Sequence, residues 1–450
     1  MARLFGTDGV RGVANKELSV NLAMQLGQAG AYVLTKEASH KPRILIGCDT
    51  RISGDMLANA LMAGICSVGA DAVYAGVVPT PAIAYLTRKY NMDAGVVISA
   101  SHNPSQFNGI KFFDRFGYKL PDAMEDEIES LIRGGLAEIE LPIGAEVGRI
   151  SNCCEQARED YITHTIEGMN IRLDGLKIVA DCAEGASHYT SVEALKRLGA
   201  EVIAIHTNPD GVNINLNCGS THMEELCERV RTEKADIGVA FDGDADRFLA
   251  VDELGKKVDG DQVMAIVGNH LMEQGKLKKD TIVVTVMSNL GMSLMAKEKG
   301  IHLEQTKVGD RYVLERMKEI GANLGGEQSG HIIMLDKNTT GDGLLSALLL
   351  LQVMVDTKKK LSELSTVMEV LPQALVNAKV PNDRKENFME CKEISDAIEK
   401  LNRKFEGSGR VLIRPSGTEP LVRVMIEGKN QSEIENDAKE LAALIEKMVQ

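Results

Sequence analysis

The segment Ala94-Gly-Val-Val-Ile-Ser-Ala-Ser-His-Asn-Pro104 joins an apolar run to a polar loop. Consecutive Val and Ile residues are typical of a buried strand, whereas Ser-His-Asn-Pro cannot continue one, so an exposed loop is expected to follow. Ser101 therefore stands where a strand ends, with His102 beside it and Lys111 ten positions on. This setting is compatible with a serine that accepts a phosphoryl group, since a phosphoserine needs cationic neighbours. An ordinary turn is the alternative.

Working outward, a strand-helix-strand-helix-strand pattern occurs three times, and each copy ends in a polar loop. The predicted strands are 44–47, 72–78 and 94–98; 177–181, 202–205 and 237–241; and 281–286, 302–306 and 322–324. The predicted helices between them are 53–68 and 82–89; 191–198 and 223–233; and 292–298 and 312–320. Alternating strands and helices imply mainly parallel pairing, which gathers the loops at the carboxyl ends of the strands.

Each polar loop is followed by an expected hairpin and then by a helix that closes the copy. The expected hairpins are 110–113 with 118–120, 248–251 with 256–258, and a less regular one at 332–335. From about residue 369 the pattern changes to three strands and two helices, at 374–380, 409–414 and 421–427, and at 391–405 and 432–448.

The predicted fold class is α/β: three duplicated mixed-sheet α/β domains and a smaller C-terminal α+β domain around a central cleft. The expected bounds of the four domains are 1–150, 151–255, 256–368 and 369–450.

The composition of the chain limits the classes of function and partner to be considered. With 450 residues and a formal net charge of −14, the protein is a poor general partner for nucleic acid, whose phosphates would be repelled. Its eight cysteines form no C-x-x-C pair, which is typical of reduced thiols in the cytoplasm. The N-terminus lacks a secretory apolar region, and the apolar segment 344–355 is too short for a membrane span. We therefore expect a cytoplasmic protein without a membrane or nucleic-acid partner.

The second polar loop, Asp242-Gly-Asp-Ala-Asp-Arg247, places carboxylates at alternate positions after a strand. Alternate side chains of an extended chain point the same way, so three oxygen ligands can converge on one divalent cation, with Mg²⁺ expected. An EF-hand calcium loop is the alternative, since Glu253 falls at its twelfth position. Its sixth position requires Gly, however, and holds Arg247. A solvated acidic turn is a further alternative.

Two more loops offer groups for a phosphorylated sugar. Arg414-Pro-Ser-Gly-Thr-Glu419, with Arg423 beyond it, combines guanidinium groups, hydroxyls and a flexible backbone, all suited to phosphate oxygens. Glu327 and Ser329 lie in a glycine-rich loop and suit sugar hydroxyls. A surface turn is the alternative for each. The segment 5–12 holds three glycines and is expected to be a loop.

The four motifs Ser99-Ala-Ser-His-Asn-Pro104, Asp242-Gly-Asp-Ala-Asp-Arg247, Gly326-Glu-Gln-Ser-Gly330 and Arg414-Pro-Ser-Gly-Thr418, in this order, resemble the α-D-phosphohexomutase family along nearly the whole chain. The resemblance implies a four-domain enzyme that interconverts hexose phosphates through a phosphoserine at Ser101 and a 1,6-bisphosphate. It also implies one Mg²⁺ per chain, with the bisphosphate as intermediate or activator. Its implied metal ligands are Ser101, Asp242, Asp244 and Asp246.

The same resemblance implies the remaining site residues. His102, Lys111 and Arg247 would join Ser101 in catalysis, with His102 and Lys111 assisting proton transfer. The implied substrate-binding residues are Gly309, Asp310, Arg311, Glu327 and Ser329 for the sugar, and Arg414, Ser416, Gly417, Thr418 and Arg423 for the phosphate that does not react.

Within the family, the segment Phe5-Gly-Thr-Asp-Gly-Val-Arg-Gly12, the form of the sugar loop and the chain length resemble members that interconvert glucosamine 6-phosphate and glucosamine 1-phosphate for amino-sugar nucleotide and cell-wall precursor synthesis. A mannose or glucose phosphate mutase on the same scaffold, and a noncatalytic phosphosugar-binding protein, are alternatives. A homodimer stays open. Ala245 departs from the glycine that the family often has there, and if that position has positive φ the methyl group costs roughly 1 kcal/mol.

Overall fold

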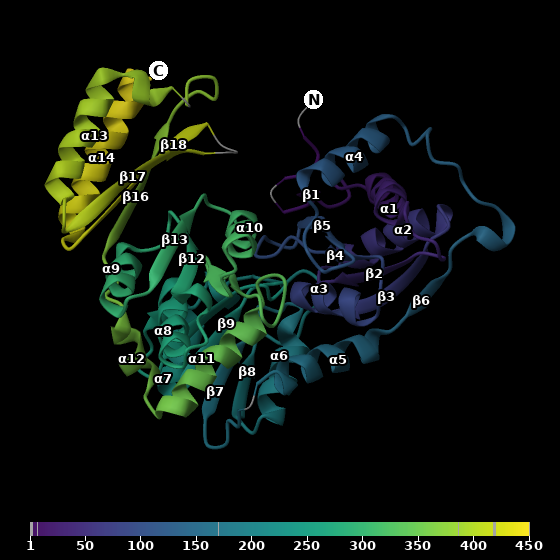
Figure 1. The fold of residues 1–450 in the computed structure, drawn as a ribbon, viewed down its shortest axis with the longest axis horizontal. Helices are drawn as coiled ribbons and strands as arrows, with labels where there is room; N and C mark the ends of the chain where they lie inside the picture. The colour runs from purple at the N-terminus through teal and green to yellow at the C-terminus, as the bar shows by residue number, and fades with distance from the viewer. Residues whose placement is uncertain (1–2, 7, 170, 386, 417–419, 450) are drawn as a thin grey trace. The chain divides into compact units, whose positions relative to one another are not determined.

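The computed structural model describes residues 3–6, 8–169, 171–385, 387–416 and 420–449 (Figure 1). The chain divides into two compact units: Met1–Met287 with Gly300–Val367, and Ser288–Lys299 with Met368–Gln450. Three sheets belong to the first unit and one to the second. The expected fold class, α/β copies followed by a smaller α+β part, is confirmed.

The first copy of the repeat is a six-stranded sheet in the order β1-β5-β4-β2-β3-β6. Its strands are β1 (Val10–Val13), β2 (Arg43–Cys48), β3 (Asp71–Val77), β4 (Ala94–Ile98), β5 (Phe107–Asp114) and β6 (Ile150–Asn152). Its helices are α1 (Val20–Thr35), α2 (Ser53–Ser67), α3 (Thr80–Lys89) and α4 (Asp122–Arg133). Strand β2 pairs in parallel with β3 and β4, and β4 pairs antiparallel with β5, so the polar loop after β4 opens at the carboxyl edge of the central strands.

Helices α1 and α2 approach each other closely because glycines line their contact. A Cβ atom added at Gly27 would lie 2.3 Å from the carbonyl oxygen of Leu61, and one added at Gly64 would lie 2.1 Å from that of Met24. No side chain fits at either position, so the two glycines set the separation of these helices.

The second copy has the sheet order β11-β10-β9-β7-β8. Its strands are β7 (Lys177–Asp181), β8 (Glu201–Ile205), β9 (Ile237–Phe241), β10 (Phe248–Asp252) and β11 (Lys257–Val258), and its helices are α5 (Cys154–Glu167), α6 (Ser187–Arg197) and α7 (Glu224–Glu233). All five residues of β9 are buried, and the aspartate loop begins directly after it.

The third copy has the order β13-β12-β14-β15. Its elements are α8 (Gly260–Glu273), β12 (Thr281–Thr285), β13 (His302–Thr306), α10 (Asp310–Ile320), β14 (Leu324–Gly326), β15 (Ile332–Met334), α11 (Gly343–Thr357) and α12 (Leu361–Leu364). The shared order of β5-β4-β2-β3, β10-β9-β7-β8 and β15-β14-β12-β13 supports the predicted repeat.

The second unit contains a three-stranded antiparallel sheet in the order β16-β18-β17. Its elements are α9 (Leu290–Lys299), β16 (Gln373–Lys379), α13 (Lys392–Phe405), β17 (Gly409–Pro415), β18 (Leu421–Gly428) and α14 (Gln431–Met448). Apolar residues of β18, α13 and α14 form its core. The short 3₁₀ helices among the described residues are Gly144–Glu146, Gly219–Thr221, Lys278–Asp280, Ser365–Val367 and Phe388–Glu390.

The first central strand of each copy ends in the same kind of turn. A side-chain oxygen of Asp49, Asp181 and Thr285 accepts the backbone N–H two residues later, at 2.9, 2.9 and 3.2 Å. Asp49 directly follows β2, and Asp181 and Thr285 are the last residues of β7 and β12. The side-chain bond satisfies an amide that leaves the sheet.

Most predicted elements are confirmed to within a few residues, and two expected elements are confirmed only in part. The segment expected as a loop at 5–12 ends in strand β1, which pairs with β5 from Val10 to Val13. The first expected hairpin is reduced to a single bridge, Phe113 with Lys119. Strand β1 pairs with residues 107–110 of β5, and the return segment joins only the far end of that strand, where the Asp114 N–H also donates to the Tyr118 carbonyl at 2.8 Å.

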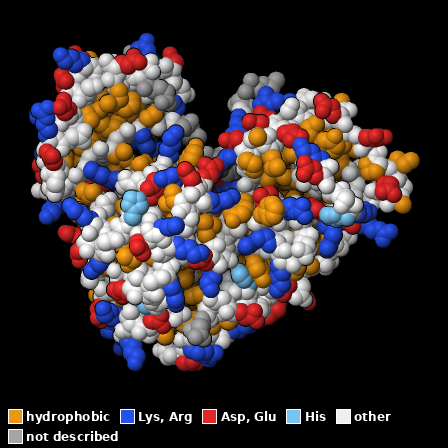
Figure 2. Space-filling view, in the orientation of Figure 1, with side chains coloured by type: hydrophobic (Ala, Val, Ile, Leu, Met, Phe, Trp, Pro, Cys, Tyr) orange, Lys and Arg blue, Asp and Glu red, His pale blue; other side chains and the backbone are white. Residues whose placement is uncertain are grey.

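Acidic and basic side chains are interspersed over the face shown in Figure 2. Among the described helices, none combines the length and the apolar character that a membrane span requires.

Candidate active site

Ser101 lies directly beyond β4, in a left-handed backbone conformation with φ of +52°. The expectation of an exposed loop is wrong here, because Ser101 is only 2% exposed. Its hydroxyl donates a hydrogen bond of 2.7 Å to Asp242 Oδ2, and His102 Nδ1 lies 3.3 Å from the same hydroxyl oxygen. A buried, strained serine in contact with a carboxylate is typical of a reactive site.

The three aspartates after β9 converge as predicted. Asp242, Asp244 and Asp246 are all buried, and each offers an oxygen within 4.8 Å of the others. Burial raises the pKa of Asp242 well above its usual value, and the Asp246 and Asp244 charges raise it further. One oxygen each of Asp244 and Asp246 is buried without a hydrogen-bond partner among the described residues. Crowded carboxylates with unused oxygens fit a divalent cation, which would supply the missing positive charge.

Ala245 adopts φ of +56° and is 1% exposed. The family glycine would suit this conformation, and the methyl group is accommodated here with all three aspartates still convergent.

Lys111 is a buried cation shared by carboxylates. Its Nζ lies 2.9 Å from Asp8 Oδ2, 2.9 Å from Asp244 Oδ2 and 3.9 Å from Asp246 Oδ2. Burial alone would lower the pKa of Lys111, but the charges of Asp244 and Asp8 outweigh it and raise that pKa above the usual value. Lys111 therefore carries a permanent positive charge at the aspartate loop.

His102 and Arg247 complete the neighbourhood of Ser101. Burial lowers the pKa of His102 to about 4, helped by the nearby positive charge of Arg247. Burial would also lower the pKa of Arg247, yet Asp242 and Asp246 raise it, and its backbone N–H donates to Asp242 Oδ1 at 3.2 Å.

A chain of ion pairs connects the aspartate loop with the third copy. Lys119 Nζ contacts Asp8 at 2.6 Å and also Asp310. His331 lies between Asp310, 3.4 Å from Nε2, and Asp246, 3.6 Å from Nδ1. Sequence reasoning did not select Asp8, Lys119 or His331. The glycine-rich segment 5–12 and the histidine that ends the sugar loop were the available signals.

The predicted sugar residues lie at the start of helix α10 and in the loop that carries Glu327. The backbone N–H of Gly309 donates to Glu327 Oε1 at 3.1 Å, and Ser329 Oγ lies 3.4 Å from Glu327 Oε2. Asp310 belongs to the ion-pair chain. Arg311 instead pairs with Asp122 and, with its Nε 3.1 Å from Oε1, with Glu315.

The predicted phosphate residues belong to the second unit. Arg414 and Arg423 are direct partners across β17 and β18. Burial lowers the pKa of Arg414, and the like charge of Arg423 lowers it further. Ser416 is 2% exposed, and its carbonyl accepts a hydrogen bond from Lys385 Nζ. Gly417 and Thr418 lie outside the described residues.

Comparison with known proteins matches the chain in order with phosphoglucomutase/phosphomannomutase alpha/beta/alpha domains I, II and III over residues 2–137, 159–255 and 259–371, and with the C-terminal domain over 375–444. Phosphoglucosamine mutase of Clostridium novyi (strain NT) is 60% identical over 446 residues, and that of Ruminiclostridium cellulolyticum is 60% identical over 447. Each alignment covers 99% of both chains. The chain belongs to the α-D-phosphohexomutase family. The expected family and the expected enzyme class, a mutase, are confirmed.

Solved structures show the same phosphohexomutase fold. A phosphoglucomutase/phosphomannomutase family protein from Burkholderia thailandensis superposes with a TM-score of 0.82 at 22% identity, covering 100% of this chain and 99% of that one. An Aspergillus fumigatus N-acetylphosphoglucosamine mutase, in complex with GlcNAc-6P and magnesium, has a TM-score of 0.68 at 17% identity, covering 99% and 96%. At these identities the likeness concerns the fold alone.

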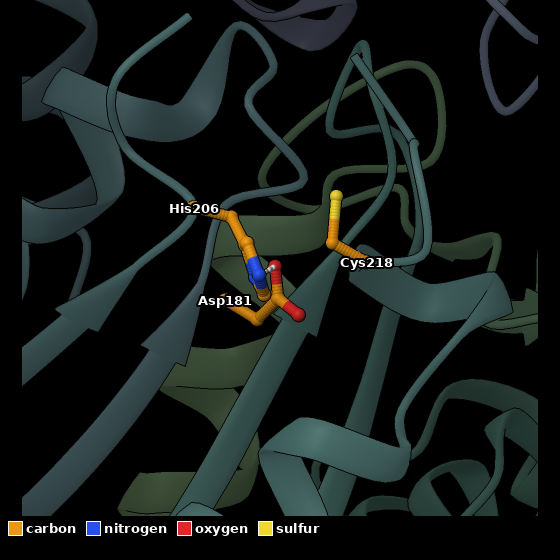
Figure 3. A group of neighbouring side chains, drawn as sticks. All are labelled: Asp181, His206 and Cys218. Carbon is orange, nitrogen blue, oxygen red and sulfur yellow. Dashed lines mark ion pairs between the residues drawn. The ribbon is translucent and has the colours of Figure 1, made fainter. Parts of the chain in front are cut away.

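This phosphohexomutase also has a second cluster of metal-ligating side chains, Asp181, His206 and Cys218 (Figure 3). The His206 ring faces the Asp181 carboxylate, with Nδ1 3.0 Å from Oδ1. Both Asp181 oxygens accept backbone N–H donors at 2.9 Å, from Ala183 and Gly219. Burial raises the pKa of the Cys218 thiol to about 12, which opposes a thiolate ligand. We interpret this cluster as a brace between loops.

Proposed function

We propose that this enzyme is a phosphoglucosamine mutase that interconverts glucosamine 6-phosphate and glucosamine 1-phosphate through a phosphorylated Ser101 and a 1,6-bisphosphate. The observation that carries the proposal is the contact of the Ser101 hydroxyl with the convergent aspartates, 2.7 Å from Asp242, in a chain whose full-length relatives have this name. In the first half-reaction the P–O bond to Ser101 breaks and a bond to the free sugar hydroxyl forms. The sugar hydroxyl loses a proton and Ser101 gains one. The second half-reaction reverses this at the other end of the sugar.

The three aspartates and a Ser101 oxygen would hold one Mg²⁺. When bound, the ion neutralises charge on the phosphoryl oxygens. The unused oxygens of Asp244 and Asp246 support this assignment.

Lys111 and Arg247 place fixed positive charge beside the reacting group. Because neighbouring carboxylates raise the pKa of Lys111, we assign it an electrostatic role instead of proton transfer. The His102 ring is neutral near pH 7, since its pKa is lowered to about 4, and its Nδ1 lies 3.3 Å from Ser101 Oγ. His102 is therefore the better candidate to exchange a proton with the serine.

Binding is proposed to use both ends of the substrate. Gly309, Asp310, Arg311, Glu327 and Ser329 would contact the sugar, and Arg414, Ser416, Gly417, Thr418 and Arg423 would hold the phosphate that does not react. The cross-strand pairing of Arg414 and Arg423 supports an anion site, because it brings two guanidinium forks together and such forks suit phosphate oxygens. A bisphosphate that turns end for end presents either phosphate to the same residues.

We further propose the four domains 1–150, 151–255, 256–368 and 369–450, a cytoplasmic location supported by eight free cysteines, and the bisphosphate as activator. The homodimer is an assembly to be tested by light scattering.

Turnover of glucosamine 6-phosphate, glucose 1-phosphate and mannose 1-phosphate by the purified enzyme tests the substrate. Greatest kcat/KM with the amino sugar is expected, and preference for another hexose would replace the proposal by its phosphomannomutase or phosphoglucomutase alternative. Intact-mass analysis with peptide mapping should find phosphate on Ser101. Activity that survives Ser101→Ala would refute the serine assignment, and binding without turnover in the native enzyme would indicate a phosphosugar sensor.

A further inference from the structure

The serine loop holds its reactive residue in an unfavourable conformation. Ser101 has φ of +52°, which costs a residue with a Cβ atom free energy, so surrounding contacts must impose it. The carbonyl oxygens of Ser101 and Asn103 face the interior and require donors. The residues that supply those donors therefore hold the Ser101 hydroxyl in place.

Two side chains supply the donors, and both bind the same two oxygens. Asn215 Nδ2 donates to the carbonyl oxygens of Ser101 at 2.9 Å and Asn103 at 3.1 Å. Arg51 Nη2 donates to the Ser101 oxygen at 3.1 Å and also to that of Asn103. Arg51 follows β2 in the first copy, and Asn215 lies in the loop after β8 in the second. We call the Arg51 and Asn215 side chains the serine clamp.

The Arg51 half of the clamp belongs to a closed ring of hydrogen bonds. The Ser101 N–H donates to Ser99 Oγ at 2.9 Å, and Ser99 in turn bonds the Asp49 carboxylate. Asp49 pairs with the Arg51 guanidinium, which returns to the Ser101 carbonyl. The Arg51 and Asp49 side chains are 0% exposed. Arg51 is therefore fixed by its own ion pair and shielded from solvent.

The Asn215 side chain of the clamp packs against the aspartate loop. A Cβ atom added at Gly243 would lie 2.7 Å from the Ser101 carbonyl oxygen and 2.8 Å from Asn215 Nδ2. The Asn215 N–H also donates to the Ala183 carbonyl at 2.9 Å, which fixes its loop. Gly243, which lies between the metal-ligand candidates Asp242 and Asp244, thus packs against the serine loop and the serine clamp without space between them.

From this geometry we propose that Arg51 and Asn215 are positioning residues for phosphoryl transfer, holding the Ser101 hydroxyl beside the aspartates by gripping its backbone from two copies of the repeat. The proposal rests on the proposed function. The clamp contacts the serine loop only through its backbone oxygens, so it governs the rate of transfer and not the affinity for sugar. A reacting oxygen displaced by about 1 Å loses roughly 100-fold in rate.

The test compares Asn215→Leu, which keeps the volume and removes both donors, with Asn213→Ala on the same loop as the matched control. Asn213 bonds within its own loop, to Asp210 and Asn208. We expect Asn215→Leu to lower kcat about 100-fold while KM changes less than about threefold. The control should retain native kcat. Arg51→Lys, which keeps the charge beside Asp49 but loses the guanidinium fork, should also lower kcat and leave KM in place.

A structural role alone would lower the folded fraction and spare the kcat of the folded molecules, so thermal midpoints and active-site titration accompany the kinetics. An Asn215→Leu kcat within threefold of native, per folded molecule, would overturn the proposal. Hydrogen exchange gives a readout independent of turnover: the amides of residues 101–108 should exchange faster in Asn215→Leu than in Asn213→Ala. Unchanged exchange would refute the clamp, whereas an inactive native enzyme with faster exchange in the variant would refute only the proposed function.

Discussion

Replacing Lys111 with methionine removes the cation that Asp8 and Asp244 share and keeps most of the side-chain volume. Each carboxylate contact is 2.9 Å long, and Lys111 is 2% exposed. At an effective dielectric constant of about 20, one such contact amounts to about 6 kcal/mol of Coulomb energy, most of which offsets the cost of burying the charges. Breaking a buried pair on one side costs about 3–5 kcal/mol. We therefore expect Lys111→Met to lower the free energy of unfolding by about that amount.

The matched control is Lys89→Met. Lys89 Nζ is 2.8 Å from Asp160 Oδ1, but its side chain is 34% exposed, so its loss should cost less than about 1 kcal/mol. Urea unfolding, with hydrogen exchange of the β4 and β5 amides as a local probe, measures both variants. Excess Mg²⁺ should reduce the deficit of Lys111→Met, because a cation at the aspartates replaces the lost charge. Equal losses for the two variants, or no effect of Mg²⁺ on Lys111→Met, would refute the reasoning.

Three further outcomes are expected. Asp181 raises the pKa of His206 from 6.5, so the contribution of His206 to protein stability is complete below about pH 6.5 and is lost as pH rises through the folded-state pKa. His206→Asn should remove that loss from a plot of unfolding free energy against pH. An unchanged slope in the variant would contradict this expectation. Gly64→Val should destabilise the first unit by about 1–3 kcal/mol in urea unfolding, because its Cβ would lie 2.1 Å from the Met24 oxygen; native-like stability would show that α1 and α2 can separate. The unfolding free energy of Ala245→Gly should stay within about 1 kcal/mol of the native value, because relief of left-handed strain offsets the lost methyl burial and the added entropy of the unfolded chain. A tenfold change in Mg²⁺ affinity, measured by calorimetry, would show instead that the methyl group orders the loop.

The repeat was predictable because its central strands, such as β4, β7 and β9, are largely buried and read as short apolar runs. Strands β4, β7, β9 and β13 lie where the pattern placed them. The three aspartates were predictable for a local reason: their spacing within one loop already aims them together. Strand β1 was missed because Val10 joins the sheet only through its long-range pairing with β5.

The remaining site residues depend on contacts that local sequence does not encode. His331 gains its place from Asp246 and Asp310, each in another loop. The burial of Ser101 similarly depends on chain segments more than 100 residues away, such as the loop that carries Asn215. Short motifs identify reactive groups, whereas the side chains that hold them emerge only from the assembled fold.

The equivalent turns at Asp49, Asp181 and Thr285 bear on how such an enzyme diversifies. Each copy has a side-chain acceptor for the same departing amide, a carboxylate in two copies and a hydroxyl in the third. The copies differ at the end of the neighbouring strand: β4 is followed by the serine, β9 by the aspartates and β14 by the sugar loop. The conserved turn and the reactive loop thus lie on adjacent strands, and in the first copy Asp49 joins them through Ser99 and Arg51.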